Sequence, residues 1–158
     1  MVPRTAMPAP FTLERLRDAA APLRAMPFAV RFQDVDAATT MFFARYFDWA
    51  SEVYLAQLMG GGVDVPGLLA RREMAIPLRH VESTYSTPLF FGDEVVVELV
   101  AAEVGTTSFA LGFRVRSAKD PAKHHAYLQT VHVCIDPRAF RPVPVPDAVR
   151  AALTTPAP

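Results

Sequence analysis

The sequence predicts an α+β fold in which an antiparallel five-stranded sheet wraps around a long central helix. Three observations predict it: a strand near the N-terminus, a long helix that is apolar on most sides, and four long strands after that helix. A helix that is apolar on most sides is buried on most sides, so other elements must surround it. The strands supply this cover, and a sheet with a helix packed on one face is an α+β arrangement.

Residues 1–25 are expected to form a lead-in with a short helix. Met1 to Pro10 contains three prolines and lacks the apolar run of a signal peptide, so we expect a flexible segment. The helix is predicted within Phe11 to Leu23, where apolar residues recur at helical spacing. These residues are Leu13, Leu16, Ala20 and Leu23.

The first strand and the central helix follow directly. Phe28, Val30 and Phe32 alternate with residues that are small or polar, which predicts a strand. The helix is expected from about Thr40 to Met59, because the glycines at 60–62 end it. Only three charged residues, at spacings of three and four, interrupt its apolar surface. They are Arg45, Asp48 and Glu52.

Four long strands are predicted in the second half of the chain, with turn signals between them. They are Glu73 to Thr87, Glu94 to Glu103, Thr107 to Ala118 and His124 to Asp136. Asp147 is expected to cap a final helix that ends at Leu153. The folded domain is therefore predicted over residues 26–153, and residues 154–158 are expected to form a flexible tail.

Composition excludes several classes of protein. A chain of 158 residues with zero formal net charge is one domain, without the basic surface typical of proteins that bind nucleic acid or anionic membranes. No stretch approaches the roughly 20 apolar residues of a membrane helix. The single cysteine, Cys134, excludes an internal disulfide and predicts a cytoplasmic protein. The four histidines lack metal-ligand spacing and no phosphate loop is present, so no metal or cofactor is expected.

Several motifs in a fixed order carry a resemblance to a known family. They are RFQDVDAA at 31–38, FFARYFDW at 42–49, FGDEV at 91–95, TVHVCID at 130–136 and RPVPVP at 141–146. In this order they resemble the hotdog fold, and in detail the 4-hydroxybenzoyl-CoA thioesterase type with its Tol-Pal-associated relatives. The resemblance covers Phe28 to Leu153, which is nearly the whole chain.

The resemblance implies an acyl-CoA thioesterase with Asp36 as its catalytic carboxylate. A thioester is hydrolysed when its carbonyl oxygen is stabilised and a carboxylate attacks the carbon or activates a water. The start of a buried helix offers unpaired N–H groups and a positive dipole end. The resemblance implies that the N–H near Phe43 polarises the carbonyl. It also implies a dimer or tetramer with sites formed between subunits.

Two residues depart from the family pattern. Thr39 stands where the family usually has glycine, and Phe43 stands where it often has tyrosine. A β-branched residue disfavours the positive φ that glycine permits. The conformation of the turn beside the oxyanion site is therefore a question for the structure.

Other carboxylates compete with Asp36, which by position alone could be a plain turn or cap residue. Asp34 is interpreted as structural, since the second aspartate carries the chemistry in the family. A related hotdog group uses a glutamate on the helix, which makes Glu52 the second candidate, ahead of Asp48. The alternative for Glu52 is an ordinary residue of the polar stripe.

Substrate contacts are predicted at two places. Phe42, Tyr46 and His80 are expected to line the acyl pocket, while Arg114 and Arg116 share a strand face and could bind CoA phosphates. The alternative for the two arginines is a solvated basic surface. The acyl group stays open, and so does the choice between CoA and a carrier protein. A non-catalytic acyl-binding protein is the other alternative.

Overall fold

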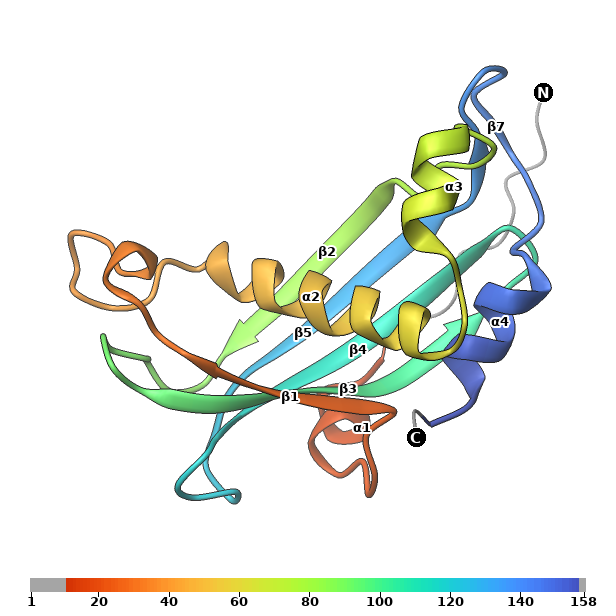
Figure 1. Cartoon of the computed structure of the whole chain (residues 1–158). Helices are drawn as coiled ribbons and strands as arrows, with labels where there is room; N and C mark the ends of the chain where they lie inside the picture. The colour runs from red at the N-terminus through yellow and green to blue at the C-terminus, as the bar shows by residue number, and fades with distance from the viewer. Residues whose placement is uncertain (1–10, 157–158) are drawn as a thin grey trace.

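A five-stranded antiparallel sheet curves around helix α2, Arg45–Gly60, in the computed structural model, which describes residues 11–156 (Figure 1). The strand order is β1-β3-β4-β5-β2. The predicted fold class is confirmed. The predictions for Met1 to Pro10 and for the last two residues lie outside the described part of the chain.

The three central strands agree closely with the sequence pattern. They are β3 (Glu94–Val104), β4 (Ser108–Ser117) and β5 (His124–Val133). In the register, Val97 is opposite Val115 and Leu99 is opposite Phe113, and these side chains are fully buried beneath α2. Because side chains alternate along a strand, the residues between them face the other side of the sheet.

The predicted first strand is shifted by four residues. Strand β1 is Arg24–Ala29, and a 3-10 turn, Phe32–Asp34, follows it. The turn forms because the buried Asp34 carboxylate accepts the N–H of Arg31, which ends the extended chain. Phe32, which was predicted to belong to the strand, lies in this turn and is 77% exposed.

Helix α2 begins five residues later than predicted, because Thr40 and Met41 form bridges with Phe90 and Val35. Its core-facing residues lie on one side only. They are Tyr46, Trp49, Ala50, Val53, Tyr54, Gln57 and Leu58. Leu55 and Met59 remain exposed, so the wrapping expected on most sides is incomplete within one chain.

Helix α3, Val65–Arg71, was not predicted. Asp64 caps it by accepting the N–H of Gly67 at 3.0 Å. As a result, strand β2 is shorter than expected and spans Leu78–Tyr85 at the edge of the sheet. None of the described helices is by itself long and apolar enough to cross a membrane. Helices α2 and α3 together reach the required length and apolar composition, but they are bent by 97° relative to each other.

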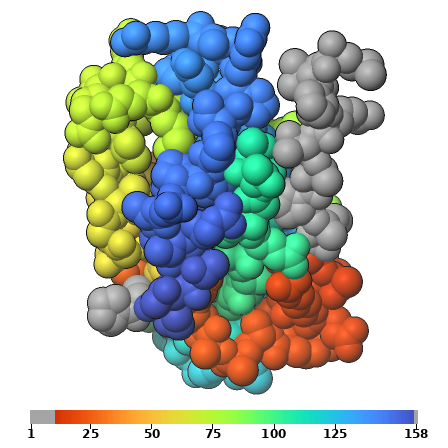
Figure 2. All heavy atoms as spheres, turned by 90° about the vertical axis from the view of Figure 1, so that its right-hand side faces the viewer, coloured from red at the N-terminus to blue at the C-terminus, as the bar shows by residue number. Residues whose placement is uncertain are grey.

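The chain ends in a small hairpin and a helix. The hairpin pairs β6 (Ile135–Asp136) with β7 (Arg141–Pro142), and α4 is Asp147–Thr154. Asp147 is the first residue of α4 and makes no side-chain cap, in contrast to the prediction. Helix α4 packs against α2 and β3 at one end of the molecule (Figure 2).

The outer face of the sheet is covered by the short helix α1, Leu13–Arg17, on the side opposite α2 (Figure 1). Phe11 and Leu16 are buried there against residues of the three central strands. Their partners are Ala101, Ala110, Tyr127 and Val131. The sheet therefore has apolar cover on both faces within one chain.

Candidate active site

Asp36 lies in a tight hairpin turn between Val35 and Met41, which form a bridge. Its N–H donates to the carbonyl of Thr40 at 3.0 Å, and its carbonyl accepts the N–H of Thr39 at 2.9 Å. This is a three-residue hairpin loop, in which a type I turn precedes a left-handed residue. The Asp36 Oδ1 atom accepts the N–H of Ala38 at 2.8 Å, which holds the exposed carboxylate against its own turn.

Thr39 occupies the left-handed position of this turn, with φ of 66°. This is the position at which the resembling family usually has glycine, so the turn is kept although the residue differs. A left-handed conformation costs a residue with a Cβ atom about 1–2 kcal/mol. Thr39 therefore stores strain immediately beside Asp36.

The chain between Asp36 and α2 exposes backbone donors. Met41 N–H donates to Leu89 O and Phe42 N–H donates to Asp34 O, both at 2.8 Å. The N–H groups of Phe43 and Ala44 have no acceptor among residues 11–156, and Ala44 provides no side-chain cap for α2. Unpaired N–H groups at the positive end of a helix dipole can stabilise a developing oxyanion.

Asp34 supports this segment and does not enter the pocket. Its carboxylate accepts the backbone N–H of Arg31 at 2.9 Å and forms an ion pair with Arg31 Nε at 3.0 Å. The hydrogen bond from Arg31 lowers the pKa of the Asp34 carboxyl. These contacts agree with the structural interpretation of Asp34.

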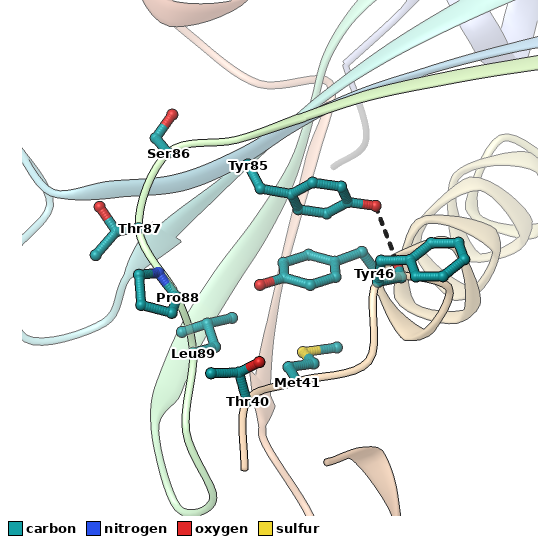
Figure 3. Close-up of a pocket in the computed structure, with 9 residues that line it drawn as sticks. Thr40, Met41, Tyr46, Tyr85, Ser86, Thr87, Pro88 and Leu89 are labelled. Atoms are coloured by element: carbon teal, nitrogen blue, oxygen red, sulfur yellow. Dashed lines mark hydrogen bonds between the residues drawn. The ribbon is translucent and has the colours of Figure 1, made fainter. Parts of the chain in front are cut away.

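A pocket of about 270 Å³ adjoins the start of α2 (Figure 3). Its walls come from the end of the Asp36 turn, from α2, and from the end of β2 with the segment after it. They are Thr40, Met41, Phe43, Tyr46, Tyr85, Ser86, Thr87, Pro88 and Leu89. The rings of Tyr46 and Tyr85 meet edge to face at 5.0 Å, and burial raises the pKa of Tyr46 to about 12. Tyr46 is therefore a neutral aromatic wall near pH 7.

The structure brings together only some of the predicted site residues. Phe43 and Tyr46 line the pocket, but Phe42 does not. The Phe42 ring packs on the Phe43 ring with their centroids 4.6 Å apart, and Phe42 is 40% exposed. His80 is exposed on β2 and lies 3.8 Å from Glu82, away from the pocket walls. Tyr85 was not predicted, because it reaches α2 only through tertiary folding.

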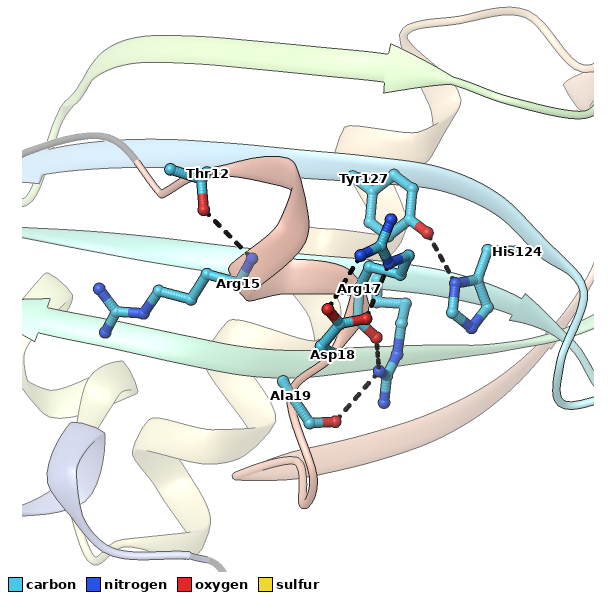
Figure 4. Close-up of polar contacts among 8 residues, drawn as sticks. Thr12, Arg15, Arg17, Asp18, Ala19, His124 and Tyr127 are labelled. Carbon is cyan, nitrogen blue, oxygen red and sulfur yellow. Dashed lines mark hydrogen bonds and ion pairs between the residues drawn. The ribbon is translucent and has the colours of Figure 1, made fainter.

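Arg114 and Arg116 lie on the outer face of the sheet, opposite α2. Both pair with Glu98, at 2.7 and 2.9 Å. Arg114 also donates to the carbonyls of Arg17 and Ala19 at the end of α1, two residues that Figure 4 labels. Arg114 and Glu98 are 9% and 4% exposed. This arrangement gives Arg114 a structural role and, within one chain, no route to the pocket.

The rival carboxylates on α2 are poorly placed for this site. Asp48 forms an exposed ion pair with Arg45 at 3.0 Å. Glu52 is exposed two turns into α2, which is about 10 Å along the axis from the helix start. Asp36 precedes the free N–H groups of Phe43 and Ala44 by seven and eight residues, but its side chain is not among the pocket walls.

Comparison with known proteins identifies the family of this chain. The family model described as the thioesterase-like superfamily matches residues 30–153. The chain belongs to this superfamily, and it is an enzyme that hydrolyses acyl-CoA thioesters. The predicted enzyme class is confirmed. The more specific resemblance to the 4-hydroxybenzoyl-CoA and Tol-Pal-associated type is not singled out by the relatives described next.

The relatives are named for aromatic acyl-CoA substrates. A 1,4-dihydroxy-2-naphthoyl-CoA hydrolase of Trichodesmium erythraeum is 31% identical over 121 residues, covering 77% of this chain and 88% of the relative. The enzyme of that name from Rippkaea orientalis is 28% identical over 76% of this chain and 87% of its own. A solved 1,4-dihydroxy-2-naphthoyl-CoA thioesterase from Synechocystis superposes with a TM-score of 0.76 at 23% identity, covering 82% and 93% of the two chains, and so supports the fold.

Proposed function

We propose that this chain hydrolyses an aromatic acyl-CoA, with Asp36 as the nucleophile or general base and the N–H groups of Phe43 and Ala44 as oxyanion donors. One observation carries the proposal. The Asp36 turn leads directly into a helix start whose N–H groups have no acceptor within the described chain. A carboxylate and an oxyanion site are the two parts that thioester hydrolysis requires.

Two routes fit this geometry and give the same products, the free acid and CoA. The Asp36 carboxylate could attack the thioester carbon, which releases the CoA thiolate and leaves a mixed anhydride that water then cleaves. It could instead take a proton from a water that attacks the same carbon. In both routes, the carbonyl oxygen gains negative charge beside the N–H groups of Phe43 and Ala44.

An aromatic acyl group is favoured by the pocket walls. Phe43, Tyr46 and Tyr85 supply aromatic surface beside the proposed oxyanion site, and flat rings pack well against each other. The relatives named for naphthoyl-CoA substrates support the same class of acyl group. Contacts from His80 to the acyl group and from Arg116 to CoA phosphates stay predictions, and the latter would require Arg116 to give up Glu98.

We also propose at least a dimer, joined through β2. This strand lies at the sheet edge with Leu78 and Val81 exposed, and an open edge is a template for pairing with another strand. Tyr85 at the end of β2 would bring a second subunit close to the pocket. Light scattering at micromolar concentration should give the dimer mass or higher, and a monomer would contradict a shared site. A cytoplasmic location also stays a prediction.

A panel of thioesters tests the substrate proposal. The panel contains CoA esters of short, long and aromatic acyl groups, and the aromatic acyl group on a phosphopantetheine carrier protein. We expect the highest kcat/KM for the aromatic CoA ester, and turnover at least a hundredfold lower by Asp36→Asn. Preference for a long aliphatic ester would contradict the aromatic assignment, and turnover of the carrier-bound ester alone would contradict CoA as the carrier.

A further inference from the structure

We propose that Tyr85 is a positioning residue, which holds the oxyanion-binding backbone of α2 from the edge strand β2. This inference rests on the proposed function. The Tyr85 hydroxyl donates to the carbonyl oxygen of Phe43 at 3.0 Å, as the dashed line in Figure 3 shows. The Ser83 hydroxyl donates in turn to the Tyr85 oxygen at 2.9 Å. Two side chains of one strand thus fix a backbone group 42 residues away in sequence.

The Phe43 carbonyl depends on Tyr85 because the helix does not use it. In a regular α-helix this carbonyl would accept the N–H of Phe47. Here the Phe47 N–H donates to the Ala44 carbonyl at 3.1 Å. The first turn is therefore tightened, and the Phe43 carbonyl turns outward to the Tyr85 hydroxyl.

Fixing this carbonyl also fixes an oxyanion donor. The Phe43 C=O and the Ala44 N–H belong to one planar, trans peptide unit, so they point in opposite directions. A similar constraint acts on the preceding unit, where the Phe42 carbonyl accepts the Arg45 N–H at 3.0 Å. Each of the two candidate donors, Phe43 N–H and Ala44 N–H, therefore belongs to a peptide that is anchored through its oxygen.

The ring and the hydroxyl of Tyr85 have separable roles. The ring packs on Tyr46 and lines the pocket, and these contacts do not need the hydroxyl. In Tyr85→Phe the packing should remain, but the Phe43 peptide can rotate and accept water instead. Oxyanion donors act because their direction is set before the reaction, and loss of a whole donor costs about 10²–10³ in kcat. Loss of its alignment should cost less, on the order of tenfold.

Steady-state kinetics on an aromatic acyl-CoA test this role. For Tyr85→Phe we expect kcat to fall about tenfold, with KM changed less than about twofold and the melting temperature within about 2 °C of wild type. Ser83→Ala should lower kcat by a smaller factor. Tyr127→Phe is the matched control, since it removes a tyrosine hydroxyl that bonds His124 at 2.6 Å on the outer face, and its kcat should equal wild type.

The outcomes separate this inference from the proposed function. Wild-type kcat in Tyr85→Phe, together with an inactive Asp36→Asn, would overturn the role of Tyr85 and leave the proposed function intact. A parallel loss of kcat and melting temperature would also overturn it, because it would show a merely structural role. Activity in Asp36→Asn would refute the proposed site, whatever Tyr85→Phe does.

Discussion

His132 should make the stability of this protein fall steeply on acidification. The ring is 9% exposed and stacks between Tyr54 and Phe109, with centroids 4.9 and 5.1 Å away. Its Nε2 contacts the Thr130 hydroxyl at 3.0 Å, and its buried Nδ1 has no partner in the described chain. Burial disfavours the charged ring and lowers the pKa of His132 to about 4.

The direction and size of the effect follow from this pKa. In the unfolded chain, His132 takes up a proton below about pH 6.5, whereas the folded protein resists protonation down to about pH 4. The unfolded state is therefore favoured as pH falls between these values. Linkage gives a loss in the free energy of unfolding of about 1.4 kcal/mol at pH 5.5 and about 2.5 kcal/mol at pH 4.5, relative to pH 7.5.

Urea unfolding at pH 7.5, 5.5 and 4.5 measures this loss at one protein concentration. His132→Phe keeps a ring between Tyr54 and Phe109 but cannot titrate. On acidification its free energy of unfolding should therefore fall less than that of the wild type, by about 1.4 kcal/mol less at pH 5.5 and about 2.5 kcal/mol less at pH 4.5. Its stability at pH 7.5 should fall by about 1 kcal/mol, because Thr130 loses its partner. Parallel losses in wild type and His132→Phe would refute the argument.

Three further variants test other parts of the structure. Asp36→Asn should lower the rate of single-turnover hydrolysis at least a hundredfold, since a positioned base alone contributes a factor of about 10²–10⁴ to the rate. This variant should still bind a non-hydrolysable acyl-CoA analogue. An inactive Glu52→Gln together with an active Asp36→Asn would show that the catalytic carboxylate is Glu52 on α2. Thr39→Gly should raise the melting temperature by about 1–3 °C and keep activity, because relief of the left-handed strain exceeds the extra conformational entropy that glycine gives the unfolded chain. Thr39→Ala keeps the Cβ atom, so its melting temperature should rise less. A loss of activity in Thr39→Gly without loss of stability would show that the threonine itself acts in the site. Gly112→Ala should lower the free energy of unfolding, measured by thermal unfolding, by about 1–3 kcal/mol, because the alanine Cβ would lie 2.4 Å from Leu16 Cδ2. An unchanged melting temperature would show that α1 moves aside without cost.

Local patterns in the sequence predicted much of the scaffold. The alternation of large apolar residues in Ser108–Ser117 identified a strand, although the structure buries its residues on both faces of the sheet. The motif around Asp36 predicted a turn before the helix, and the turn is present with Thr39 in the glycine conformation. Helix α3 was missed, although Asp64 followed by Pro66 is a typical helix start.

Residues whose surroundings depend on register could not be predicted in this way. The pairing of Glu98 with Arg114 is set by the alignment of β3 and β4, which also decides which sheet face carries the charges. The contact between Tyr85 and Phe43 joins a strand end to a helix start, and no spacing in the sequence encodes it. Thus periodicity identifies the elements, while the meeting of distant elements determines the site.

The contact between Phe11 and Gln129 has a consequence for assembly. The side-chain amide of Gln129 bonds both the N–H and the carbonyl of Phe11, so it binds the backbone of this residue as a neighbouring strand would. Phe11 and α1 therefore occupy part of the sheet face that a second copy would have to contact in order to stack on it. Under the proposed assembly, contacts beyond the dimer joined through β2 are expected on the helical side, where Leu55, Met59 and Leu69 are exposed.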